Sequence, residues 1–313
     1  MLEVAMPPFI LIGGPTASGK TALAVALARH IGGEVINTDS MQLYRGLDIL
    51  SAQPDEAERA GVPHHLFAVA DPSERWSAGR WARAALAIAE PLQKRGVPAV
   101  FVGGTGLYFK ALIDGIAPAP DIPAGVRADV GALEQSGYAP LRAEAERLDA
   151  EGAGRIKPGD RQRLVRLIEL VRTTGKPLSV LHADTRPLIA PGSWAGFALR
   201  PDREALYARI ERRFDAMMAA GALEEARALH ARGLDRQLPA LKAVGVRPLL
   251  AHLDGELHLE EAVERAKTDS RRYAKRQFTW FTNQHADWTR LDAPTHEENF
   301  ARLRIALEET DTP

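Results

Sequence analysis

Residues 14–21 read Gly-Pro-Thr-Ala-Ser-Gly-Lys-Thr and match the P-loop pattern G-x-x-x-x-G-K-[ST] at every fixed position. The apolar run Phe9–Ile12 precedes the motif, and an Ala- and Leu-rich segment, Thr21–His30, follows it. The sequence therefore predicts the strand, glycine loop and helix that the motif requires. Backbone N–H groups, the helix N-terminus and a lysine would then face an anion. The predicted phosphate-binding residues are Gly14, Pro15, Thr16, Ala17, Ser18, Gly19, Lys20 and Thr21, and Thr21 is also the predicted Mg²⁺ ligand.

Strands and helices alternate after this motif. Glu34–Thr38 and Ala99–Val102 are β-prone runs, and the helix-like segment Ala78–Arg95 lies between them. Such alternation predicts a parallel sheet with right-handed crossovers, in which ligands bind at the carboxyl ends of the strands. We therefore predict an α/β fold, a P-loop NTPase-like parallel sheet flanked by helices, with an all-helical insertion and a helical C-terminal region.

Composition changes mark the boundaries of that insertion. The segment 118–123 is rich in proline, and Val126–Arg172 has helical periodicity throughout, whereas Trp194–Leu199 restores a strand pattern. We assign 1–117 to the first part of the core, 118–195 to the helical insertion, and 196–313 to core completion and C-terminal helices. The last twenty residues are polar, and we expect them to fray.

Composition also excludes several classes of site and location. The chain has no cysteine, which rules out disulfides, thiolate nucleophiles and Cys-based metal sites. The first apolar run is too short to span a bilayer and has no basic segment before it, so we expect the protein in the cytoplasm, without membrane contact. We also expect a monomer, although the sequence does not determine the oligomeric state. The net charge of −1 means that any nucleic acid must bind through local basic clusters.

A P-loop indicates phosphate but not the compound that carries it. The chain has no Asn-Lys-x-Asp sequence, as a GTPase would, and no apolar strand ending in Asp-Glu, as a motor ATPase would. A small-molecule kinase and another phosphate-handling transferase both remain.

Two further loops follow predicted strands. Asp39 directly follows the second strand, where a carboxylate can bind Mg²⁺, take a proton, or simply cap a helix. The glycine-rich loop 103–106 follows the third strand, and its Thr105 hydroxyl could approach the same ligand, although glycine pairs after strands are mostly tight turns.

Taken in order, these loops resemble the tRNA dimethylallyltransferases, also called IPP transferases. GPTASGKT is followed by DSMQLY at 39–44 and GGTGLYFKAL at 103–112. The resemblance continues nearly end to end, through GDRQRLVR at 159–166, Arg209-Ile210 with Arg213-Phe214, AVGVR at 243–247, and KRQFTW at 275–280.

The resemblance implies transfer of a dimethylallyl group from its pyrophosphate to N6 of the adenine next to the anticodon of a tRNA. The P-loop and Mg²⁺ would then bind a pyrophosphate leaving group, although such a loop is easily labelled an ATP site. By the same resemblance Asp39 is the general base and Thr105 supports the pyrophosphate or the amine. Arg209 and Arg213 share a helix face and could clamp the pyrophosphate from the side opposite the P-loop, and which of the two reaches it stays open.

The implied partner is the anticodon stem-loop of tRNA, whose single-stranded loop lets the adenine leave the stack. Ser40, Met41 and Gln42 would grip the base. Val246 stands where the family usually has tyrosine, so a contact to the RNA is missing there. The predicted tRNA-binding residues are Asp39, Ser40, Met41, Gln42, Thr105, Arg127, Gln162, Arg163, Leu164, Val165, Arg166, Lys242, Ala243, Val244, Gly245, Val246, Arg247, Lys275 and Arg276.

Two alternatives differ from prenyl transfer. An ATP-dependent small-molecule or nucleoside kinase would share the P-loop, the aspartate after the second strand and the later arginines, but would not need an RNA-binding C-terminal half. A noncatalytic RNA-binding protein could retain a phosphate site, but the presence of both Asp39 and Thr105 argues against it.

Overall fold

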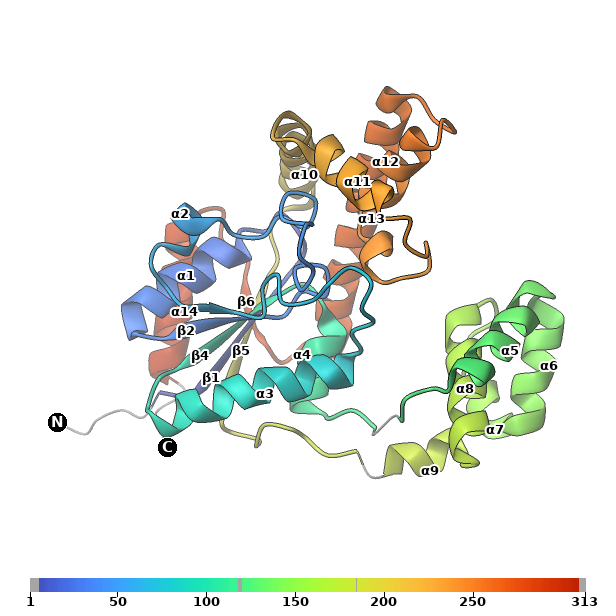
Figure 1. The fold of residues 1–313 in the computed structure, drawn as a ribbon. Helices are drawn as coiled ribbons and strands as arrows, with labels where there is room; N and C mark the ends of the chain where they lie inside the picture. The colour runs from blue at the N-terminus through green and yellow to red at the C-terminus, as the bar shows by residue number, and fades with distance from the viewer. Residues whose placement is uncertain (1–5, 118–119, 184, 310–313) are drawn as a thin grey trace. The chain divides into compact units, whose positions relative to one another are not determined.

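The computed structural model describes residues 6–117, 120–183 and 185–309. Its sheet has six parallel strands in the order β3-β2-β4-β1-β5-β6 (Figure 1). The strands are β1 (Phe9–Gly13), β2 (Glu34–Asn37), β3 (His64–His65), β4 (Ala99–Gly103), β5 (Trp194–Leu199) and β6 (Thr289–Leu291). The predicted parallel α/β fold is confirmed.

Helices cover both faces of this sheet. The helices of the compact unit formed by Met1–Lys110 and Ile189–Pro313 are α1 (Lys20–Ile31), α2 (Glu56–Arg59), α3 (Ala78–Lys94), α10 (Arg203–Ala219), α11 (Ala222–Ala231), α12 (Val246–Leu253), α13 (Leu259–Gln284) and α14 (His296–Glu309), with the 3-10 helix η1 (Ala240–Lys242) before α12. Helix α4 (Gly106–Ile113) begins in this unit. None of the described helices is both long and apolar enough to cross a bilayer.

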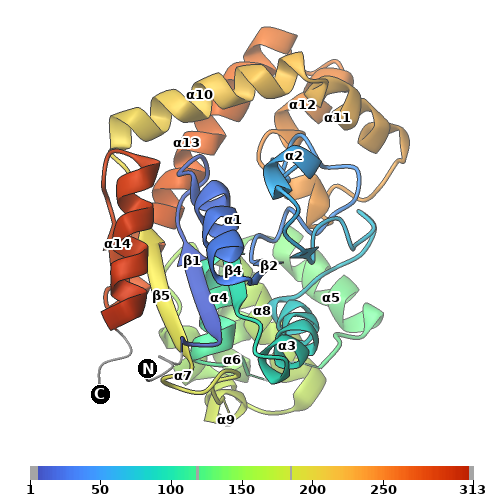
Figure 2. The same ribbon diagram turned by 90° about the vertical axis from the view of Figure 1, so that its left-hand side faces the viewer.

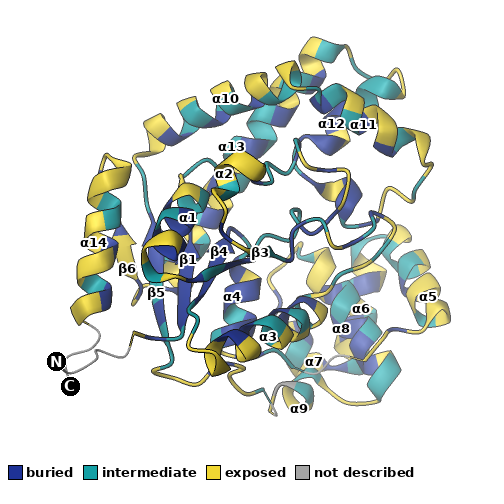
Figure 3. Cartoon of the chain, turned by 60° about the vertical axis from the view of Figure 1, so that its left-hand side comes forward, coloured by how far each residue is buried: buried dark blue, intermediate teal, exposed yellow. Residues whose placement is uncertain are grey.

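Alternation along the strands gives the sheet two different faces. Ile10 and Ile12 of β1 belong to a hydrophobic cluster that also contains residues of α1 and α14. Figure 2 shows the ribbons of these two helices beside the sheet. On the opposite face Phe9 lies edge-to-face with Phe101, and Phe109 of α4 contacts Phe281 of α13 in the same way. The central strands β1 and β4 are fully buried between these layers (Figure 3), and burial of these apolar side chains is the main source of stability.

The C-terminal segment differs from expectation. We expected the last twenty residues to fray, but residues 296–309 form helix α14, and residues 310–313 lie outside the described part. Leu303 and Leu307, four residues apart, are buried against the sheet core. A helix with one narrow apolar stripe is polar on average, so its amino-acid composition does not indicate that it packs on the core. The short edge strands β3 and β6 were also missed, since two or three residues carry little periodicity.

The second compact unit, Ala111–Leu188, is helical, as the sequence predicted. It contains α5 (Ala124–Gln135), α6 (Tyr138–Leu148), α7 (Ala150–Gly154), α8 (Arg161–Thr174) and α9 (Leu178–Ala183) around a core that includes Leu141, Leu164 and Leu167. The sequence placed the insertion at 118–195. Residues 194 and 195 lie in β5 of the first unit.

Candidate active site

Three loops meet at the carboxyl ends of β2, β4 and β1, which are neighbours in the sheet. The N–H of Thr105 donates to the carbonyl oxygen of Thr38 at 3.2 Å, which joins the third loop to the second. A β-carbon on Gly103 would overlap the backbone of Thr38. Glycine at this position is therefore required for the close approach of the two loops.

The phosphate loop has the backbone conformation that its glycines allow. Gly19, which precedes α1, has φ of 89°, in the region that favours glycine, and α1 begins at Lys20. Nζ of Lys20 donates to the carbonyl oxygen of Pro15 at 3.4 Å. Oγ of Ser18 is buried and has no hydrogen-bond partner among the residues that the structure describes. A buried hydroxyl without a partner fits a site built for an oxyanion.

Two cations come close to this loop. Burial lowers the pKa of Lys20 to about 8, the Asp39 carboxylate opposes that shift, and Arg213 adds to it. Burial likewise lowers the pKa of Arg213, with Asp39 opposing. A site that holds lysine and arginine together at a cost in desolvation is suited to a ligand with several negative charges.

Helix α10 supplies both predicted arginines to the loop. Nε of Arg209 donates to the carbonyl oxygen of Ala17 at 3.0 Å, and Nη2 of Arg213 donates to Oγ1 of Thr16. Nη2 of Arg209 is buried and lacks a hydrogen-bond partner within the described ranges. Both guanidinium groups therefore hold the loop, and Arg209 keeps a free donor for a phosphate oxygen.

The turn after β2 fixes Asp39. Oδ1 of Asn37 accepts from the N–H of Asp39 at 2.7 Å, and Oδ1 of Asp39 accepts from the N–H of Met41 at 3.0 Å. Oγ1 of Thr105 accepts from the N–H of Ser40 at 3.0 Å and donates to Oγ of Ser40 at 3.2 Å. Thr105, a predicted catalytic residue, thus stabilises the turn that carries the carboxylate of Asp39.

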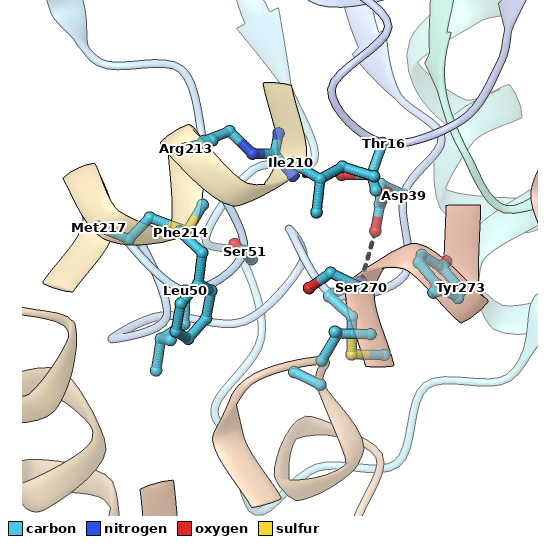
Figure 4. A pocket seen from close by; sticks show the side chains of 13 residues that line it. Thr16, Asp39, Leu50, Ser51, Ile210, Arg213, Phe214, Met217, Ser270 and Tyr273 are labelled. Atoms are coloured by element: carbon cyan, nitrogen blue, oxygen red, sulfur yellow. Dashed lines mark hydrogen bonds between the residues drawn. The ribbon is translucent and has the colours of Figure 1, made fainter. Parts of the chain in front are cut away.

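A pocket opens beside Asp39 (Figure 4). Thr16, Asp39, Arg213 and Tyr273 give it a polar side. Burial and the Asp39 carboxylate raise the pKa of Tyr273, so this phenol stays protonated at neutral pH. The remaining wall is mostly apolar and consists of Met41, Leu50, Ser51, Ile210, Phe214, Met217, Ala243, Val244 and Ser270.

A second cavity, of about 1020 Å³, lies along the phosphate loop and the start of α1. It shares Arg213 and Met217 with the pocket beside Asp39, so the two cavities adjoin at α10. Thr21, Asp48 and Glu58 line it. No group of three His, Cys, Asp or Glu side chains in the described residues could hold a metal unaided. The Thr21 hydroxyl and the separate carboxylates of Asp48 and Glu58 nonetheless fit Mg²⁺, because this ion takes most of its ligands from water and phosphate oxygens.

The second loop uses its predicted base-binding residues in different ways. Met41 lines the pocket, but Nε2 of Gln42 donates to the carbonyl oxygens of Ser51 and Ala52, at 3.1 and 2.7 Å. Gln42 therefore fixes the segment that contributes Leu50 and Ser51 to the pocket wall.

The block at 242–247 is divided between pocket and surface. Ala243 and Val244 line the pocket, and Lys242 and Arg247 are exposed. Gly245 and Val246 are buried, and Val246 begins α12. On α13, Lys275 and Arg276 are exposed, with the Arg276 guanidinium 5.5 Å from the ring centre of Tyr273.

The remaining predicted RNA contacts lie in the helical unit. Arg127 on α5 and Gln162 and Arg163 on α8 are exposed, and Arg166 is half-buried and pairs with Glu169 at 3.3 Å. Val165 is half-buried, and Leu164 is fully buried in the core of the unit. The exposed side chains are available to a polyanion, whereas Leu164 serves the packing of the helix that presents them.

Sequence reasoning missed two polar residues of α13. Tyr273 lines the pocket, and Gln277 bonds both the phosphate loop and the third loop. Gln277 lies in the KRQFTW block, but only its charged neighbours Lys275 and Arg276 were predicted to bind RNA. The spacing of Tyr273 and Gln277, four residues apart, was the available signal for a shared helix face.

Comparison with known proteins agrees with this geometry. The family model described as IPP transferase matches residues 42–284, and the model described as isopentenyl transferase matches residues 8–65. The tRNA dimethylallyltransferase of Maricaulis maris is 52% identical over 305 residues, which cover 97% of this chain and 99% of the relative. That of Phenylobacterium zucineum is 52% identical over 98% of this chain and 99% of its own length.

Two solved structures are similar as well. The full-length tRNA isopentenylpyrophosphate transferase of Bacillus halodurans superposes with a TM-score of 0.71 at 36% identity, covering 97% of this chain and 98% of that one. A eukaryotic dimethylallyltransferase acting on tRNA gives a TM-score of 0.80 at 28% identity, over 95% of this chain and 77% of that one. The chain therefore belongs to the IPP transferase family, the tRNA dimethylallyltransferases.

Proposed function

We propose that this prenyltransferase moves a dimethylallyl group from dimethylallyl pyrophosphate to N6 of the adenine next to the anticodon of a tRNA. The observation that carries the proposal is the pocket in which Asp39, Thr16 and Arg213 face an apolar wall. A diphosphate cradle beside an apolar pocket suits a prenyl diphosphate better than a nucleoside triphosphate. Sugar and base hydroxyls and amines would be left without partners on such a wall.

The phosphate loop would stabilise the leaving group. As the C–O bond to the pyrophosphate breaks, negative charge grows on its oxygens. Lys20, the free Nη2 of Arg209 and the unpartnered Oγ of Ser18 are donors already in place for that charge. Thr21 would help to hold Mg²⁺, which when bound supplies further neutralisation of the diphosphate.

Asp39 would act on the other substrate. An aromatic amine is a weak nucleophile, so a carboxylate that takes the N6 proton while the C–N bond forms lowers the barrier. The bond made is N6 to the allylic carbon, the bond lost is from that carbon to the pyrophosphate oxygen, and the proton passes to Asp39. Thr105, through Ser40, keeps the turn that carries Asp39 in place.

The exposed basic residues of α13 and of the 242–247 block would bind the tRNA backbone. Lys275, Arg276, Lys242 and Arg247 lie in the same unit as the pocket, and the exposed Arg127, Gln162 and Arg163 would add contacts from the helical unit. Phosphate contacts of this kind position the RNA, while the pocket selects the base.

The deciding experiment incubates the protein with unmodified tRNA, Mg²⁺ and dimethylallyl pyrophosphate, followed by mass analysis of the digested nucleosides. The expected result is a gain of one dimethylallyl group on adenosine without ATP. A parallel reaction supplies ATP and small metabolites instead. ATP consumption in that reaction, with unmodified adenosine in the first, would favour the kinase alternative.

The lowered pKa of Lys20 predicts a pH dependence of donor capture. Below its pKa of about 8 the lysine is an ammonium ion that attracts diphosphate, and above it the charge is lost. Because kcat/KM reports ionisations of free enzyme, kcat/KM for dimethylallyl pyrophosphate should fall as pH rises through about 8. The Lys20→Arg variant, whose guanidinium stays charged, should lack that fall. An unchanged profile in the variant would assign the ionisation to another group.

A further inference from the structure

We propose that Gln277 is a positioning residue that sets the distance between the phosphate loop and the third loop, and so aligns the two substrates for transfer. The inference rests on the proposed function, because it assumes that the diphosphate is bound at the phosphate loop and that the amine lies at Asp39, whose turn is held by Thr105 of the third loop. Gln277 does not reach either substrate in this proposal and acts only through the backbone that it holds.

The amide of Gln277 bridges two backbones. Its Oε1 accepts from the N–H of Thr16 at 2.8 Å, and its Nε2 donates to the carbonyl oxygen of Gly104 at 2.9 Å. The side chain is 4% exposed, so both ends of the amide are used away from water. Loss of a buried hydrogen bond costs more than loss of an exposed one, because no water replaces the missing partner.

The bridge begins where the sheet ends. The β1–β4 ladder stops at the pair Gly13 and Gly103, and the catalytic loops extend beyond it. Gln277 thus continues the connection between these two chain segments after the last ladder pair. Thr16 is also fixed through its side chain by Arg213, while the residue after Gly104 is Thr105, which holds the turn of Asp39.

The third loop and the end of β1 are shaped to let α13 approach. A β-carbon on Gly104 would overlap Nε2 of Gln277, one on Gly106 would overlap Trp280, and one on Gly13 would overlap Phe281. Because these three glycines have no side chain, one face of α13 packs directly against their backbone. Gln277 is the member of that face that bonds both loops, whereas Phe281 packs among aromatic rings.

A change in the spacing of these loops alters the distance between the allylic carbon and N6. Misplacement by about 1 Å can cost about 10²-fold in rate, because a reactive geometry tolerates little error. The phosphate loop and the Asp39 turn would still bind their substrates, since Lys20, Arg209 and Asp39 remain. The proposal therefore predicts loss in kcat with little change in binding.

The test replaces Gln277 with methionine, which has similar length and no hydrogen-bonding amide. In single-turnover prenylation of tRNA by the full chain, the rate at saturating substrates should fall about 10²-fold. The KM for dimethylallyl pyrophosphate and the Kd for tRNA should stay near the wild-type values. Gln284→Met, the same change at an exposed site on α13, should leave the rate unchanged.

Two further variants separate positioning from loss of stability. Leu303→Ala empties part of the core in α14 and should lower the melting temperature without lowering the rate at a temperature below melting. Gln277→Glu keeps an acceptor for Thr16 but loses the donor to Gly104 while it is ionised. Protonation of this buried carboxyl restores the donor, so its rate relative to wild type should rise as pH falls.

A wild-type rate in Gln277→Met would overturn the inference. A change in KM without a change in the rate at saturating substrates would also overturn it. So would a fall in rate that Leu303→Ala reproduces when it lowers the melting temperature by the same amount. The rate of each variant is compared with the rate of prenylation by the wild-type chain in the same assay. A wild-type chain that fails to prenylate tRNA would reject the proposed function itself.

Discussion

Replacing Asp39 with asparagine is expected to lower the rate of prenyl transfer by about 10²–10⁴-fold, the usual contribution of a general base. Asparagine keeps an oxygen that can accept from the N–H of Met41, so the turn should survive. It cannot take the N6 proton, and it removes the negative charge beside Lys20 and Arg213. Single-turnover prenylation measures the loss, and a filter-binding Kd for tRNA should change little.

The matched control for this variant is Asp287→Asn, an exposed aspartate after α13 that has no place in the site. Its turnover should equal that of the wild type. Substantial turnover in Asp39→Asn, with tRNA binding intact, would show that another group or solvent accepts the proton. A parallel loss of tRNA binding would instead assign Asp39 to base recognition.

Replacing Lys20 with methionine should reduce kcat/KM for dimethylallyl pyrophosphate by about 10²–10³-fold, as expected when one preorganised donor to a developing oxyanion is lost. Methionine has a similar length and can occupy the buried position without a new unpaired charge. The fold should persist, because the ammonium group is held there at a cost in desolvation.

Binding of inorganic pyrophosphate, measured by calorimetry, should weaken in the same variant. Lys94→Met, at the exposed end of α3, provides the matched control and should bind pyrophosphate normally. Unaltered pyrophosphate binding by Lys20→Met would mean that the loop amides and the arginines of α10 suffice, and that Lys20 serves another purpose.

The sequence predicted what is determined locally. The phosphate loop, Asp39 after β2 and Thr105 after β4 each follow an apolar strand, and parallel strands bring their carboxyl ends to one edge of the sheet. The pairing of Arg209 with Arg213 was also visible, because residues four apart share a helix face. Their contacts with Ala17 and Thr16 were not predicted, because we expected this helix face to hold the pyrophosphate from the side opposite the phosphate loop.

What was missed depends on contacts between distant parts of the chain. Gln277 and Thr16 are 261 positions apart, and no periodicity encodes their hydrogen bond. The bonds from the amide nitrogen of Gln42 to the 51–52 segment were also not visible in the sequence, and the role of Gln42 in binding the base stays a prediction. Helix α14 was taken for a frayed end because tertiary burial of Leu303 and Leu307, rather than composition, decides its structure.

The seating of α13 on Gly13, Gly104 and Gly106 also determines when the site is complete during synthesis. Translation delivers the phosphate loop early and the 277–281 segment more than two hundred residues later. Until that segment arrives, the loops lack the helix that spaces them, even though Lys20, Asp39 and Thr105 have already been made. We therefore expect nascent or prematurely terminated chains to carry the chemical groups without acting on tRNA, with activity only in the nearly finished polypeptide.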